Sequence, residues 1–115
     1  MSDKKWQKRL DDILWRIDKI EHFMAGKNKA DIADDDITVT VLERHLSVIG
    51  EAVNFIPAKV KKEFPAVPWD SIYRMRNILV HAYDVISSDV LWETAVRDLP
   101  VLKETILQMK ERYDQ

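Results

Sequence analysis

The sequence predicts an all-α fold, and three of its features lead to that class. Only two glycines and four prolines interrupt the 115 residues, and strong helix formers fill the intervals between them. Apolar residues recur every three or four positions over long segments, which is the period of one helix face. The β-branched run ITVTV, residues 37–41, has no second strand candidate with which to pair. At 46% hydrophobic composition the chain can bury a core, and we expect a single domain over residues 1–115.

The first predicted helix carries one apolar stripe. Its members lie three and four positions apart and are Trp6, Leu10, Ile13, Leu14, Ile17, Ile20 and Met24. Gly26 is a favourable place for this helix to stop. The acidic residues 34–36 then offer an N-cap, and a negative charge beside the positive end of the next helix dipole.

The second predicted helix, residues 37–56, is apolar around much of its circumference. Such a helix must be buried on more than one side. We therefore expect it either at the centre of the domain or in an interface between subunits.

Prolines and polar caps divide the rest of the chain. Pro57 precedes a short basic helical segment, and Pro68 suits the first turn of a helix that reaches about Tyr83. Residues 87–89 supply the N-cap of a last helix, in which Pro100 should produce a kink. Four main helices with an extra short helix predict an antiparallel four-helix bundle.

Charge and composition limit the function. The 18 basic and 20 acidic residues give a net charge of -2, so a nucleic acid partner would have to be held by a local patch. The absence of cysteine excludes a disulfide framework and a thiolate metal site, and fits a reducing compartment. No apolar leader and no run near the ~18 apolar residues of a membrane span is present. We expect a cytoplasmic protein with no membrane partner.

The segment RNILVHAY, residues 76–83, places polar side chains among aliphatic ones. Arg76 and Tyr83 share one flank of the apolar stripe on a helix, whereas His81 lies about 140° around the axis from Arg76. On a straight helix Arg76 and His81 therefore cannot easily hold one phosphate. Either the helix unwinds near His81, or two copies of the chain complete one cleft, and two-fold dimers are the commonest oligomers.

These residue types suit phosphodiester chemistry without a metal or another cofactor. Arginine makes forked hydrogen bonds to phosphate, and histidine can exchange a proton with a ribose hydroxyl or a leaving oxygen. Asn77 could orient the imidazole or the phosphate, and Tyr83 could stack on a base or be modified. The structural alternative is a solvated arginine beside surface histidine and tyrosine side chains.

Arg76, His81 and Tyr83 match the R-x4-H-x-Y signature of HepT-like proteins, a branch of the HEPN (higher eukaryotes and prokaryotes nucleotide-binding) superfamily that this sequence resembles. The likeness extends to IGEAVNFIP, FPAVPWDSIYRMRNILVHAY and VLWETAVRDLPVLKETI, and covers roughly residues 37–106. The resemblance implies a HEPN-like helical homodimer.

The resemblance also implies an activity. The implied activity is that of a metal-independent ribonuclease that serves as the toxin of a two-gene toxin–antitoxin pair. Cleavage within the RNA strand and cleavage from its end are both open from the sequence, and we expect the former. Arg76 and His81 would be the ribonuclease pair, and Asn77 the polar residue that follows the arginine. Tyr83 would be the tyrosine adenylylated by the antitoxin, a minimal nucleotidyltransferase. The added AMP would place negative charge and bulk beside Arg76 and compete with RNA phosphate.

A second hypothesis is a non-catalytic helical module that binds a nucleotidyltransferase partner or a nucleotide through the same polar strip. Several other residues also allow two interpretations. The lysines of residues 59–62 could extend an RNA path or form a solvated helix face. The four tryptophans (Trp6, Trp15, Trp69 and Trp92) could stack bases, but we expect them in the core. Glu51 needs a partner if it is buried, and Arg74 and Arg76 are the candidates.

Overall fold

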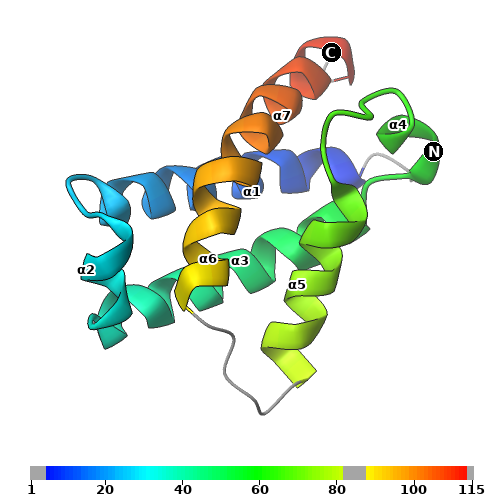
Figure 1. Cartoon of the computed structure of the whole chain (residues 1–115). Helices are drawn as coiled ribbons and strands as arrows, with labels where there is room; N and C mark the ends of the chain where they lie inside the picture. The colour runs from blue at the N-terminus through cyan, green and yellow to red at the C-terminus, as the bar shows by residue number, and fades with distance from the viewer. Residues whose placement is uncertain (1–4, 82–87, 114–115) are drawn as a thin grey trace.

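The computed structural model describes residues 5–81 and 88–113, and every regular element within these ranges is helical (Figure 1). This confirms the all-α class. The elements are α1 (Lys5–Met24), α2 (Lys29–Ala33), α3 (Asp36–Asn54), α4 (Ala58–Lys61), α5 (Trp69–His81), α6 (Ser88–Glu93), the π-helical turn η2 (Thr94–Asp98) and α7 (Leu99–Tyr113). The run ITVTV lies in α3, as a helix rather than a strand.

Helix α3 is the central element that positions the others. Helices α1 and α3 pack side by side in opposite directions, α5 crosses α3, and α7 packs on α1 (Figure 1). The predicted central place of α3 is therefore confirmed within one chain. The core between these helices consists mainly of buried aliphatic side chains, among them Leu10, Ile13, Ile17, Leu42, Leu46, Ile49, Val53, Leu91, Leu99, Leu102 and Ile106.

The acidic cap predicted for α3 is confirmed at Asp35. Its carboxylate accepts hydrogen bonds from the Thr38 hydroxyl, at 2.7 Å, and from the Thr38 backbone N–H, at 3.1 Å. Both hydrogen bonds favour the ionised carboxylate and hold the pKa of Asp35 below its usual value. The start of α3 is thereby fixed by a charged N-cap.

The short helix α2 was not predicted. Gly26 ends the turn after α1 with a φ of 76°, as expected for a residue without a side chain. A capping box follows, in which the Asn28 side chain accepts from the Asp31 N–H and the Asp31 carboxylate accepts from the Asn28 N–H, both at 2.9 Å. This reciprocal pair is enough to start five residues of helix between α1 and α3.

The last helical segment is irregular ahead of Pro100, where the sequence predicted a kink. The backbone widens into the π-helical turn η2, which ends with the Leu99 N–H donating to the Thr94 carbonyl. Proline has no N–H and its ring crowds the preceding turn, and a wider turn relieves both constraints. Helix α6 begins at Ser88, whereas Ser87 and the predicted end of α5 at Tyr83 lie outside the described residues.

One of the tryptophans contradicts the expectation of burial. Trp6 lies in the core, but the Trp15 side chain is 51% exposed on α1. The cations of Arg16 and Lys19 lie 5.4 and 5.3 Å from the Trp15 ring centre, so the ring forms a surface cation–π cluster instead. No helix among the described residues is both long and apolar enough to cross a bilayer.

Candidate active site

Arg76 lies on α5 where this helix crosses α3, and its guanidinium is held from two sides. One terminal nitrogen, Nη2, lies 3.0 Å from a carboxylate oxygen of Glu51 on α3. The other, Nη1, donates to the amide oxygen of Asn77 at 2.8 Å. The structure thus selects Arg76, rather than Arg74, as the partner of Glu51.

The guanidinium keeps donors to spare in this arrangement. Arginine carries five N–H donors, and the contacts to Glu51 and Asn77 occupy one on each terminal nitrogen. The Arg76 side chain is 21% exposed, so solvent or a ligand can reach it. A phosphate could therefore bind to a guanidinium that is already oriented.

Gly50 permits the close approach of α3 and α5 at this point. A β-carbon on Gly50 would lie 2.3 Å from the Cβ of Arg76 and 3.1 Å from the carbonyl oxygen of Ile72. Because both of these atoms belong to or adjoin the α5 backbone, no side-chain rotation could relieve the overlap. The aliphatic stem of Arg76 therefore rests directly on the backbone of α3.

Tyr73 and Trp69 share the Arg76 face of α5. They precede Arg76 by three and seven positions, and the Tyr73 ring centre lies 6.0 Å from the guanidinium carbon. Asp70 and Arg74, on the other side of the helix, are exposed. The polar residues of α5 therefore lie on two sides of the helix. One side carries Arg76, and the other faces solvent.

His81 is the last described residue of α5, and its side chain and the whole of Tyr83 lie outside what the structure describes. Helix α5 is continuous from Trp69 to His81, so no unwinding occurs between Arg76 and His81. The backbone of His81 is therefore about 7.5 Å further along the axis and about 140° around it from Arg76. Exposed Ile78 and Arg74 lie on the same side of the helix as His81.

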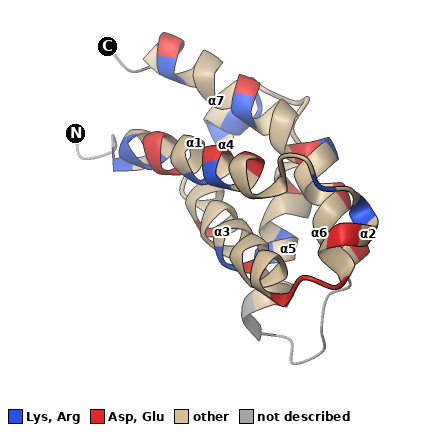
Figure 2. Cartoon of the chain, turned by 90° about the vertical axis from the view of Figure 1, so that its left-hand side faces the viewer, with Lys and Arg blue, Asp and Glu red and all other residues tan. Residues whose placement is uncertain are grey.

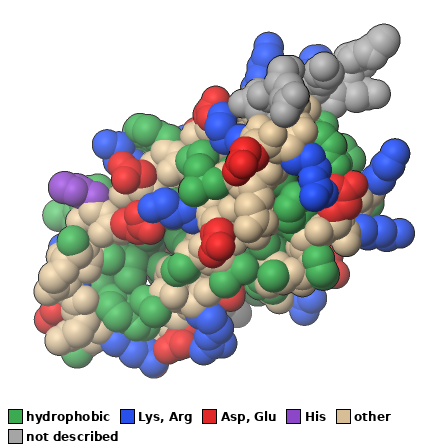
Figure 3. All heavy atoms as spheres, turned by 90° about the horizontal axis from the view of Figure 1, so that it is seen from above, with side chains coloured by type: hydrophobic (Ala, Val, Ile, Leu, Met, Phe, Trp, Pro, Cys, Tyr) green, Lys and Arg blue, Asp and Glu red, His purple; other side chains and the backbone are tan. Residues whose placement is uncertain are grey.

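Charges of both signs are interspersed over the helices (Figure 2) and over the face shown in Figure 3. A polyanion such as RNA would therefore be bound by a few individually positioned cations, such as Arg76, and not by a continuous basic surface. Within residues 5–81 and 88–113, no set of three or more His, Cys, Asp or Glu side chains is arranged to hold a metal ion.

Together, the fold and this site describe a class of protein: small all-helical domains with an oriented arginine where two helices cross. The family model described as "Ribonuclease HepT-like" matches residues 13–109. This chain belongs to the HepT-like family.

Curated relatives agree with that assignment. A protein of Thermococcus cleftensis named "Probable ribonuclease HepT" is 39% identical over 94 residues, which are 82% of this chain and 86% of that protein. "Putative RNase TTE0752" of Caldanaerobacter subterraneus subsp. tengcongensis is 27% identical over 90% of this chain and 92% of its own length.

A longer relative, "Gamma-glutamylcyclotransferase and putative RNase MJ0434" of Methanocaldococcus jannaschii, is 30% identical over 91% of this chain. This chain spans about half of that protein, 47% of its length. No solved structure gives a significant match.

Proposed function

We propose that this chain is a metal-independent ribonuclease that cuts within RNA strands, with Arg76 and His81 contributed to each site by two copies of the chain. The observation that carries the proposal is the oriented Arg76 guanidinium, held by Glu51 at 3.0 Å and Asn77 at 2.8 Å with donors still available. Membership of the HepT-like family and relatives named as ribonucleases support RNA as the substrate.

The chemistry needs only an acid–base group and a cation. The His81 imidazole takes the proton from a ribose 2′-hydroxyl, and the 2′ oxygen attacks the adjacent phosphorus. The bond from phosphorus to the 5′ oxygen of the next nucleotide breaks, which leaves a 2′,3′-cyclic phosphate, and the 5′ oxygen takes its proton from the imidazolium of His81. Arg76 stabilises the charge that develops on the phosphate oxygens. Attack by the 2′-hydroxyl restricts the substrate to RNA.

Two copies of the chain are invoked because of the geometry of α5. The helix is continuous through His81, and about 140° separates Arg76 from His81 around the axis of one helix. Ile78, on the His81 side of α5, is a large apolar residue that is 43% exposed. A second α5 packed across a two-fold axis would cover Ile78 and bring the His81 of one chain toward the Arg76 of the other.

The proposed physiological role is that of a toxin whose antitoxin is a minimal nucleotidyltransferase. Transfer of AMP to the Tyr83 hydroxyl would add a phosphodiester charge to a residue seven positions from Arg76, on the same flank of an extended α5. This part of the proposal depends on family membership and on the sequence spacing, because Tyr83 lies outside the described residues.

Cleavage of RNA in EDTA by the purified chain tests the ribonuclease. Arg76→Ala and His81→Ala should each abolish cleavage and leave the far-UV circular dichroism unchanged. Arg97→Ala, which removes an arginine 73% exposed on η2, is the matched control and should cleave normally. If the wild-type chain binds a nucleotide or a nucleotidyltransferase but cuts no RNA, and Arg76→Ala weakens that binding, the chain is a binding module instead.

A further inference from the structure

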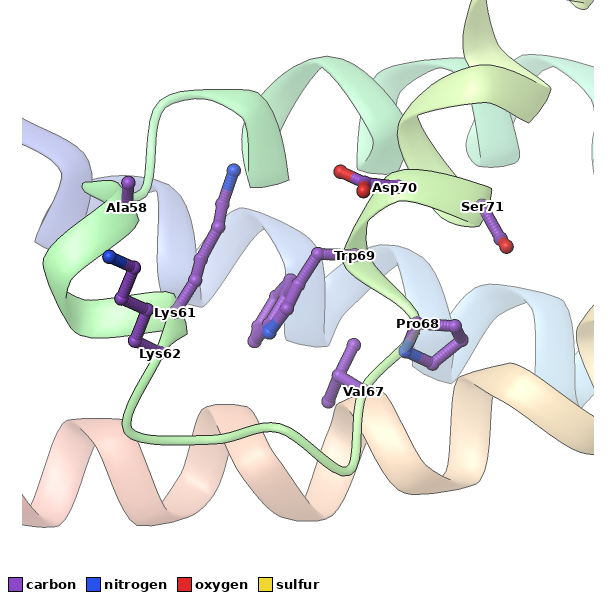
Figure 4. Close-up of a pocket in the computed structure, with 8 residues that line it drawn as sticks. All are labelled: Ala58, Lys61, Lys62, Val67, Pro68, Trp69, Asp70 and Ser71. Atoms are coloured by element: carbon purple, nitrogen blue, oxygen red, sulfur yellow. The ribbon is translucent and has the colours of Figure 1, made fainter.

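A pocket of about 530 Å³ opens where α4 faces the start of α5 (Figure 4). Its volume lies within the usual range for small-ligand sites, about 300–1,000 Å³. The lining combines two lysines of the α4 region with an indole ring and short polar side chains of α5: Lys61, Lys62, Trp69, Asp70 and Ser71. The ribonuclease chemistry proposed above does not use these residues.

The two lysines of this pocket are not held in ion pairs within the described residues, although the Asp70 carboxylate lines the same pocket. Neither Lys61 nor Lys62 makes an ion pair with any residue in the described part of the chain. Lys61 extends beside Trp69, while Lys62 points away from the ring at the rim (Figure 4). Partial burial lowers the pKa of Lys61, and Asp70 offsets that effect only in part. An anion bound beside Lys61 would restore the stability of its charged form.

The Trp69 ring is held in place rather than free to turn. Its indole N–H donates to the Phe64 carbonyl oxygen at 3.1 Å, and the ring packs partly against the core. An aromatic side chain with a fixed orientation forms a ready surface for a nucleobase, since every base can stack on a π face.

The pocket is aligned with the candidate active site. Trp69 precedes Arg76 by seven positions, so both lie on one face of α5 and are separated by about 10.5 Å along the axis. Tyr73 lies between them on the same face. A single RNA strand that runs along the solvent edge of this face would reach both the pocket and the exposed part of the Arg76 side chain.

We propose that this pocket is a nucleotide subsite of the ribonuclease, in which Lys61 and Lys62 bind a phosphate near the cut and Trp69 stacks on a base. The inference rests on the proposed ribonuclease function. It adds the position of the RNA that flanks the cleaved bond. The subsite serves affinity and positioning, and the chemistry stays with Arg76 and His81.

Equilibrium binding of a fluorescein-labelled single-stranded RNA to His81→Ala protein, which should not cut it, tests the subsite. Adding Lys61→Ala and Lys62→Ala should weaken binding about 10-fold and flatten the slope of log affinity against log salt by about 0.7 for each phosphate that the protein no longer neutralises. Lys59→Ala is the matched control, because Lys59 is exposed on the same helix but does not line the pocket. It should change affinity less than about 2-fold.

Tryptophan fluorescence supplies a second measurement. RNA should quench the emission of the His81→Ala protein, and Trp69→Phe should remove most of that quenching. The subsite would be overturned if Lys59→Ala weakened RNA binding as much as the Lys61 and Lys62 substitutions do, or if RNA quenched Trp69→Phe as fully as the parent protein. In either case, cleavage of RNA by the wild-type chain would still support the proposed ribonuclease function. If the wild-type chain neither binds nor cuts RNA, both proposals fail.

Discussion

Gly50 and Arg76 touch across the crossing of α3 and α5, where a β-carbon on residue 50 would lie 2.3 Å from the Arg76 Cβ. The position of the arginine is therefore determined by the backbone of another helix as well as by its own. This close approach leads to the first of five predictions.

Gly50→Ala should destabilise the chain and reduce cleavage. Alanine normally stabilises a helix interior by about 1 kcal/mol relative to glycine, but overpacking costs about 1–3 kcal/mol, and an overlap this severe lies at the upper end. We expect a net loss of roughly 1–2 kcal/mol in urea unfolding, with a fall in RNA cleavage because Arg76 is displaced. Gly26→Ala is the control, since its cost comes from a φ of 76° with no atom within 4 Å. It should lose stability and retain activity per folded molecule; equal loss of activity in both variants would contradict the account.

Glu51 should act as a positioning residue for Arg76. Both side chains are partly exposed, 41% and 21%, so Glu51→Ala should cost less than about 1 kcal/mol of stability. The freed guanidinium should lower kcat roughly 10-fold to 100-fold, whereas RNA affinity should hold or tighten because a negative charge has been removed. Glu51→Gln retains an oxygen acceptor and should recover part of kcat. An unchanged kcat in Glu51→Ala would show that the ion pair has no part in cleavage.

Much of this architecture could be predicted from the sequence. Apolar spacing identified α1, α3 and α5, and the acidic residues before α3 predicted its cap at Asp35, because these signals are local. Helix α2 was missed because five residues carry no readable period, and its capping box needs a specific local geometry. Trp15 was placed wrongly because burial was inferred from its residue type, whereas its position is about 180° around α1 from the buried stripe and beside the cations of Arg16 and Lys19.

The candidate site was only partly predictable, for a related reason. The signature identified Arg76, but the role of Gly50 depends on which residue of another helix faces it, and Glu51 had two possible partners until the helices were placed. An isolated glycine within an apolar helical run was the available signal for a close helix crossing. The roles of His81 and Tyr83 stay predictions.

His45 should make stability depend on pH. Its Nδ1 accepts from the Arg16 guanidinium at 3.1 Å, so the neutral ring is the bound form. Partial burial, and then the charges of Arg16 and Arg44, lower the pKa of His45 below 6.5. Between the two pKa values of His45 the unfolded chain binds more protons than the folded chain. The stabilisation from neutral His45 is therefore complete above the pKa that His45 has in the unfolded chain, and it is lost as the pH falls from there toward the pKa that His45 has in the folded chain.

Urea unfolding at pH 7 and pH 5 measures that effect. The wild-type chain should lose more stability over this interval than His45→Gln, in which the amide oxygen can still accept from Arg16. His22→Gln, at an exposed position on α1, should behave like the wild type. An identical pH dependence in all three chains would argue against a protonation-sensitive His45.

Tyr83 should be the acceptor of AMP when the chain is produced together with its nucleotidyltransferase partner. Intact-mass spectrometry should show additions of AMP on the wild-type chain and none on Tyr83→Phe, and the modified chain should lose RNA cleavage. Tyr73→Phe is the matched control, since Tyr73 lies on the Arg76 face of α5 but outside the signature. AMP on a tyrosine other than Tyr83 would contradict the proposed regulation.

Mixing two inactive variants tests the shared cleft most directly. Arg76→Ala and His81→Ala chains, each inactive alone, are unfolded together and refolded as a mixture, and RNA cleavage is measured against refolded wild type. If each site takes Arg76 from one chain and His81 from the other, half the dimers are mixed and each has one intact site, so about a quarter of wild-type activity should return. A mixture that dimerises fully yet stays as inactive as its parents would contradict the composite site.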